Sequence, residues 1–137
     1  MMKLILAIGA ALLVAVGMGW AWGASGKSDI SRALQTAELR DGLLEGRAAV
    51  LDARLDIYSI NFGEASRHFE AARSALRAAD ARLKDLGRQE DAARLQMALM
   101  RIDDAQRMAG QLNQNANSLA ADAAKTISDV LGRTAKP

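Results

Sequence analysis

Apolar residues recur four and three positions apart along most of the chain between Ile30 and Leu86. This spacing places side chains on one side of an α-helix, whereas a β-strand requires alternation at every second position. The chain has only one proline and few aromatic residues, which also favours helices. The pattern therefore predicts an all-α protein. The first part of the predicted seam consists of Ile30, Leu34, Ala37, Leu44, Ala48, Leu51, Leu55 and Tyr58, with Asp41 in the one vacant slot.

Other apolar residues widen this seam in its second half. Leu43, Val50, Ile57 and Ile60 lie beside the seam positions, so we expect this helix to be buried on more than one side. Two glycines, Gly42 and Gly46, fall within the same helix. They mark either a bend or close crossing, or positions at which exposed glycine is tolerated.

The 4-3 spacing continues without interruption through Asn61, so periodicity alone allows one long helix from Ile30 to Leu86. A turn at Asn61–Gly63 is favoured because asparagine competes for backbone hydrogen bonds and glycine loosens the chain. Glu64 would then lie in the first turn of a new helix, where its charge suits the helix dipole. We expect two helices here and leave the single helix as the alternative.

Residues 51–76 resemble one helical hairpin of the tetratricopeptide-repeat family. An aromatic residue precedes the turn, and an aromatic, an alanine, an aromatic and an alanine follow it at matching offsets. The chain departs from the family at Ile60, where the repeat usually has glycine, and has no second copy 34 residues later. The resemblance implies a hairpin, not a repeat array, and weakly implies protein binding. The implied packing positions are Tyr58, Phe62, Ala65, Phe69 and Ala72.

The rest of the chain predicts two further helices in a small antiparallel bundle. Gly87 is expected to end the second helix, and a turn is expected at Asn113–Ser118. The helical domain is predicted over residues 29–132, with a disordered tail at 133–137. The third helix carries Ala92, Leu95, Leu99, Ile102 and Ala109, and the last carries Leu119, Ala123, Ile127, Val130 and Leu131.

The N-terminus, residues 1–23, contains a run of about 19 uncharged residues from Leu4 to Trp22. As a helix this run would extend roughly 28 Å, close to the thickness of a bilayer core. It is either a retained transmembrane anchor or a cleaved export signal. We favour the anchor because the run is long for a signal core and ends in Trp20 and Trp22, which suit the membrane interface. Residues 24–28 are expected to form a flexible link.

Small residues form a ladder with a period of four along this run. Such a ladder allows two helices to approach closely within a membrane, although a run so rich in alanine and glycine also produces one by chance. We expect it to pack against another transmembrane helix. Its members are Ala7, Ala11, Ala15, Gly19 and Gly23.

Lys3, which precedes the uncharged run, favours an N-terminus on the cytoplasmic side of the membrane. Lys27, Arg32 and Arg40 follow the run, and a strict count of basic residues would place the domain inside. Long domains cross membranes largely regardless of charge, so we expect a single-pass protein of the bacterial cytoplasmic (inner) membrane with a periplasmic domain.

The amino-acid composition excludes several kinds of catalytic, metal-binding and nucleic-acid-binding site. There is no cysteine, and His68 is the one histidine, so no usual metal-ligand set is present. Pairing of His68 with Met97, Met100 or Met108 at a haem is the less favoured alternative to a surface histidine and core methionines. The acidic pairs Glu90-Asp91 and Asp103-Asp104 are expected to be solvated. No basic stripe indicates nucleic-acid binding.

We therefore expect a non-enzymatic protein with no catalytic residues, cofactor or metal. The expected function is that of a membrane-anchored interaction or scaffold protein, an accessory subunit of a larger membrane complex. Its partners would be the lipid bilayer and other membrane proteins, bound through the transmembrane helix and the helical domain. The alternative is an exported soluble binding or carrier protein released by signal cleavage.

Overall fold

In a computed structural model of the protein, the backbone is described for residues 2–135 and the side chains for residues 30–135. Across these residues the chain forms four helices and no strand, which confirms the all-α prediction. The chain divides into two compact units, Met1–Gln35 and Thr36–Pro137. The helices are α1 (Met2–Tyr58), α2 (Phe62–Asp85), α3 (Gln89–Gly110) and α4 (Ala116–Thr134).

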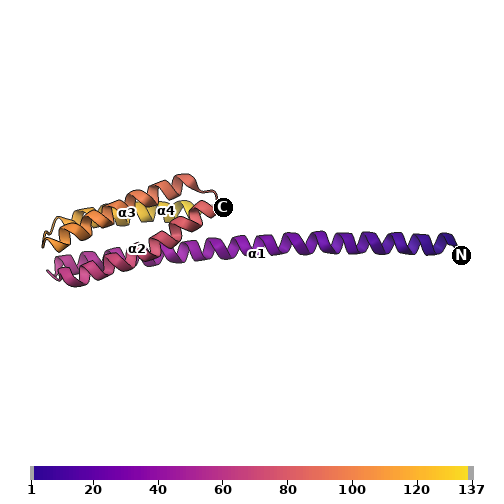
Figure 1. The fold of residues 1–137 in the computed structure, drawn as a ribbon, viewed down its shortest axis with the longest axis horizontal. Helices are drawn as coiled ribbons and strands as arrows, with labels where there is room; N and C mark the ends of the chain where they lie inside the picture. Colours follow the sequence, from indigo (N-terminus) through magenta and orange to yellow (C-terminus); the bar gives the residue numbers. More distant parts are fainter. Residues whose placement is uncertain (1, 136–137) are drawn as a thin grey trace. The chain divides into compact units, whose positions relative to one another are not determined.

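The second unit is an antiparallel helical bundle made by the last part of α1 together with α2, α3 and α4 (Figure 1). Polar contacts show the antiparallel direction of α1 and α2. Asp56 near the end of α1 contacts His68 near the start of α2, whereas Glu38 forms an ion pair with Arg82 near the end of α2. The predicted bundle is therefore confirmed for this unit.

The core of the bundle is filled largely by alanine and aliphatic side chains, with Phe69 as the one large aromatic residue. On α2 the buried positions keep the 4-3 spacing seen in the sequence, which confirms that part of the seam. The small alanines allow neighbouring helices to approach closely. The buried residues of α2 are Ala65, Phe69, Ala72, Leu76, Ala79 and Leu83.

The predicted seam of α1 does not enter the core, whereas Leu43, Val50 and Ile57, which were expected to widen it, are buried as predicted. Ile60, expected to be buried with them, is exposed. Of the expected seam, Leu44, Leu55 and Tyr58 are exposed and Leu51 is half-buried. Helical residues are about 100° apart, so the helix carries two apolar stripes on nearly opposite sides, and periodicity alone cannot choose between them. The face that enters the core consists of Leu39, Leu43, Gly46, Val50, Ala53 and Ile57.

Gly46 lies directly against the side chain of Leu76 on α2. A Cβ atom placed on Gly46 would lie 2.5 Å from two side-chain carbons of Leu76, which is too close for any packed pair. A Cβ on Gly42 would lie 3.4 Å from the carbonyl oxygen of Ala75, an ordinary contact. Both glycines therefore lie against α2, Gly46 against a leucine side chain and Gly42 close to the α2 backbone, which agrees with a close contact between the helices.

The turn between α1 and α2 consists of residues 59–61, so Phe62 and Gly63 begin α2 and the expected turn lies slightly too late. The α2–α3 turn agrees with the sequence. Gly87 has φ 72°, its N–H donates to the carbonyl of Lys84 at 3.0 Å, and Arg88 N–H donates to that of Leu83 at 2.8 Å. This is the Schellman motif, in which glycine satisfies the last carbonyls of a helix.

Two expected boundaries differ from the structure. Residues 24–28, expected to be a flexible link, fall within α1, because isolated glycines weaken a helix by only about 1 kcal/mol each. The tail expected at 133–137 is helical through Thr134. Thr134 is buried and Arg133 is ion-paired with Asp91, which holds the last turn of α4. Lys136 and Pro137 lie outside the described residues.

In the described part of the chain, we find no helix that is both long and apolar enough to cross a bilayer. The predicted anchor at residues 4–22 lies outside the residues whose side chains are described. The same holds for the small-residue ladder, whose members are Ala7, Ala11, Ala15, Gly19 and Gly23, and for Trp20 and Trp22.

Candidate functional site

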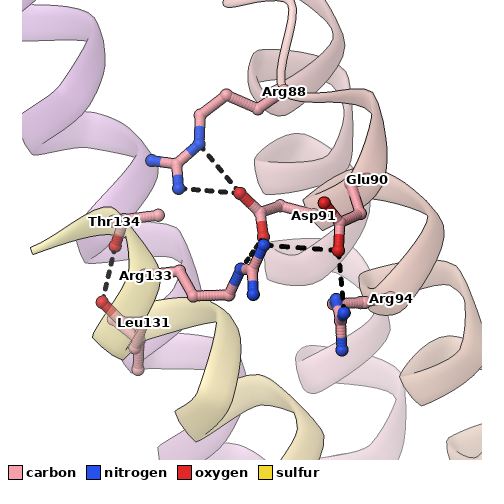
Figure 2. Close-up of polar contacts among 7 residues, drawn as sticks. All are labelled: Arg88, Glu90, Asp91, Arg94, Leu131, Arg133 and Thr134. Carbon is pink, nitrogen blue, oxygen red and sulfur yellow. Dashed lines mark hydrogen bonds and ion pairs between the residues drawn. The ribbon is translucent and has the colours of Figure 1, made fainter. Parts of the chain in front are cut away.

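One end of the bundle is closed by a polar network between the start of α3 and the end of α4 (Figure 2). Asp91 Oδ2 accepts hydrogen bonds from Arg88 Nε and Nη2 at 2.9 and 2.7 Å, and Oδ1 accepts one from Arg133 Nε at 2.8 Å. Asp91 is only 5% exposed, contrary to the expectation that it is solvated. A carboxylate can be buried here because two guanidinium groups compensate its charge. We call this region the network end.

Glu90 extends the network on its outer side. Its Oε1 accepts a hydrogen bond from Arg94 Nη2 at 2.8 Å and lies 3.3 Å from Arg133 Nη2. The hydrogen bond from Arg94, and then the positive charge of Arg133, lower the pKa of Glu90 below its ordinary value. The same hydrogen bond raises the pKa of Arg94. Arg133 of α4 contacts both acidic residues, whereas Arg88 and Arg94 pair with them at the start of α3, so the network is a structural clamp between α3 and α4.

His68, the candidate singled out by its uniqueness, ties α1 to α2. Its Nδ1 lies 2.7 Å from Asp56 Oδ2, with the imidazole N–H donating to the carboxylate. Among the residues whose side chains are described, no three histidine, cysteine or acidic residues are grouped to hold a metal ion. Met97 and Met100 are exposed on α3 instead of filling the core as expected.

The opposite end of the bundle carries large apolar residues in a strained backbone conformation. Ile60 has φ 62° and Leu112 has φ 54°. They are the non-glycine residues with positive φ in the described part of the chain. A left-handed conformation is unusual for any residue other than glycine, and for a β-branched residue it is a true outlier. Figure 1 shows the α1–α2 and α3–α4 turns at the same end of the bundle, which we call the apolar end.

Burial does not compensate this strain. Ile60 is 67% exposed and Leu112 is 71% exposed. A depression is lined by Ile57 and Tyr58 at the end of α1, by Gln114 in the α3–α4 turn and by Asn117 of α4. The apolar end therefore presents Ile60 and Leu112 to solvent.

Of the residues expected to pack the hairpin, most are buried or half-buried and one is exposed. Ala65, Phe69 and Ala72 are fully buried, and Phe62 is half-buried against the same core. Tyr58 is 82% exposed, so the expectation that it packs inside the hairpin was wrong. It lies on the outward face of α1, because Ile57 occupies the inward position in that turn.

The sequence analysis missed Ile60 and Leu112 as surface features. A signal for Ile60 was present, since the tetratricopeptide pattern has glycine where this chain has isoleucine. Leu112 follows Gly110 by two positions, and no spacing rule indicated that leucine would take the left-handed position. Asp91 was also missed, because its partner Arg133 is distant in the sequence.

Comparison of the chain with models of protein families, with curated proteins and with solved structures found no match.

Proposed function

We propose that this chain is a membrane-anchored, non-catalytic interaction protein that serves as an accessory subunit of a larger membrane protein complex. Residues 4–22 would anchor it in the bacterial cytoplasmic membrane, with the bundle on the periplasmic side. The length of the uncharged run and the tryptophans that end it support the anchor. The apolar end of the bundle would bind a partner protein.

The observation that carries this proposal is the exposed, strained pair Ile60 and Leu112. A left-handed backbone at a residue other than glycine costs about 1–2 kcal/mol, and glycine would remove that cost. Both side chains point into water, where they gain little from the fold. Strain of this kind is kept at functional positions, and exposed apolar side chains at one place indicate a binding surface.

A purification from native membranes in mild detergent tests the proposal. A tagged wild-type chain is compared with Ile60→Gly/Leu112→Gly, and with Met97→Ala/Met100→Ala as a matched control that removes two exposed apolar side chains from α3. We expect the wild type and the methionine variant to retain the same partner and the glycine variant to lose it while remaining folded. Retention of that partner by the glycine variant, or extraction of the wild type without any partner, would overturn the proposal.

N-terminal sequencing of the same material tests the anchor. We expect the mature chain to begin before Leu4. A mature chain that begins after Trp22 would refute the anchor and support the alternative of an exported soluble binding protein.

A further inference from the structure

The face of α1 directed away from the bundle core carries apolar residues with the spacing of a coiled coil. Leu44, Leu55 and Tyr58 are 50%, 66% and 82% exposed, so the fold of one chain leaves three large apolar side chains in water. We call this face the outer stripe. Within the second unit it consists of Ala37, Asp41, Leu44, Ala48, Leu51, Leu55 and Tyr58, which alternate four and three positions apart like the a and d positions of heptads.

Neighbouring helices of the same chain lie to both sides of this stripe without covering it. On one side Glu38 forms an ion pair with Arg82 of α2. On the other side Arg47 Nε donates to Ser128 Oγ at 2.7 Å, and Arg54 Nε donates to Asn117 Oδ1 at 2.8 Å. The contacts to α2 and α4 thus bound the outer stripe, and its centre faces outward.

Charged residues follow the two edges of the stripe in separate rows. Arg40, Arg47 and Arg54 recur every seven positions along the edge nearest α4. An acidic row, also with a period of seven, follows the edge nearest α2. It consists of Glu38, Glu45 and Asp52. In heptad terms the basic row occupies g positions and the acidic row occupies e positions.

This arrangement of charge favours a second copy of the chain as the partner, with the two helices parallel. In a parallel pair of identical helices, each g position faces the e position five residues further along the other helix, so Arg40 would face Glu45 and Arg47 would face Asp52. In an antiparallel pair, g faces g and e faces e, so arginines would oppose arginines. We propose that two copies of this chain associate through their outer stripes as a parallel, in-register pair of α1 helices.

Asp41 is the one unfavourable position within the stripe. It occupies an a position, so in the in-register pair the two like-charged carboxylates would face each other and weaken the association, and the register follows from the charge rows alone. Two copies anchored in one membrane through residues 4–22 would also be parallel. Only that supporting point rests on the proposed function, because the charge rows argue for a parallel pair by themselves.

Cysteine cross-linking of the full chain in mild detergent tests the pairing directly, because the natural sequence contains no cysteine. Ala37→Cys and Tyr58→Cys place single thiols at d positions three heptads apart, and Ala93→Cys on an exposed face of α3 is the control. On mild oxidation we expect Ala37→Cys and Tyr58→Cys each to cross-link with itself far more than Ala93→Cys does.

Two results would overturn the proposal. Cross-linking only when Ala37→Cys and Tyr58→Cys chains are mixed would show an antiparallel pair. Cross-linking no greater than that of the Ala93→Cys control would show that the outer stripe does not join two copies, and that a different protein or none covers it.

A charge exchange tests the register independently. Arg40→Glu should weaken dimerisation about tenfold, because two like-charged contacts form in each dimer. Adding Glu45→Arg should restore wild-type affinity. Failure of the double variant to recover would refute the in-register pairing.

The test is separate from that of the proposed function. The Ile60→Gly/Leu112→Gly changes leave the outer stripe intact, so Ala37→Cys in that background should cross-link as much as Ala37→Cys alone, even if the membrane partner is lost.

Discussion

Helices at both ends of the bundle are followed by a residue in the left-handed conformation, but the residue type differs between the ends. At the network end Gly87 ends α2 in a left-handed conformation, and its N–H donates to the carbonyl of Lys84 at 3.0 Å. At the apolar end Ile60 and Leu112 take the same position after α1 and α3, with equivalent hydrogen bonds of 3.1 and 2.9 Å to the carbonyls of Ile57 and Ala109. The backbone geometry is the same in all three turns, and glycine satisfies it at Gly87. The backbone therefore does not explain why large apolar residues occupy this position at the apolar end.

The ends also differ in what their side chains contact. At the network end Asp91, Arg88 and Arg133 satisfy one another, and the polar groups are used within the chain. At the apolar end Ile60 and Leu112 face solvent. The comparison indicates that one end stabilises the bundle and the other is kept at a cost in stability, as expected of a surface used for binding.

The largest expected effect is at the network end. Asp91→Ala should lower the free energy of unfolding by about 3 kcal/mol, because it leaves two arginines facing a site without its carboxylate. Chemical denaturation followed by circular dichroism measures this loss. Glu90→Gln, on the exposed side of the same network, should change stability far less than Asp91→Ala does, because exposed ion pairs contribute little. Similar losses for both variants would contradict a specific role for Asp91.

Gly87→Ala tests the glycine turn. No atom lies within 4 Å of the added Cβ, so the effect comes from the backbone conformation alone. We expect a loss of about 1 kcal/mol, measured by the same denaturation. Gly63→Ala is a matched control, because its added Cβ is also free of contacts and no left-handed φ is required there. It should be neutral or slightly stabilising.

Ile60→Gly, at the apolar end, should change the free energy of unfolding in the direction opposite to Gly87→Ala. Relief of the left-handed strain should raise the free energy of unfolding by up to about 1 kcal/mol, and Leu112→Gly should act similarly. Ile60→Ala removes most of the side chain without permitting the left-handed backbone as freely, so it should stabilise less. If Ile60→Gly is destabilising, the isoleucine contributes to folding, and the distinction between the two ends is lost.

The smallest effect concerns pH at the network end. The pKa of Glu90 is lower in the folded protein than its ordinary value of 4.5, so folding favours the charged form. The stabilisation is therefore present above pH 4.5 and is lost as the pH falls through the lowered folded pKa. Denaturation of wild type and Glu90→Gln should show a difference near pH 6 that shrinks in acid. A difference that is constant with pH would contradict this role of Glu90.

The sequence predicted some elements well for identifiable reasons. On α2 one apolar stripe with 4-3 spacing has polar residues on the other faces, so only one face can enter a core, and it does. Gly87 ends α2 because glycine readily takes the left-handed conformation. The turn near Asn61 was correctly favoured over a single helix, although α1 ends at Tyr58. The likeness of this hairpin to a tetratricopeptide repeat remains a prediction.

Other features could not be read from the sequence. On α1 two apolar stripes compete, and the choice depends on which one α2 and α4 can approach. Gly46 lies on the chosen face and admits Leu76, which spacing alone did not indicate. The clamp between Asp91 and Arg133 joins residues 42 positions apart, so neither local propensity nor periodicity predicts it. The same contact explains why α4 continues beyond Gly132.

By itself, the order of residues determined that this chain forms helices and where most of them turn, because periodicity and glycine act over a few neighbouring positions. Only the tertiary structure decided which side of α1 is buried, which carboxylate is withdrawn from water and which bulky residues are left outside. Those choices depend on contacts between segments that are distant in the chain.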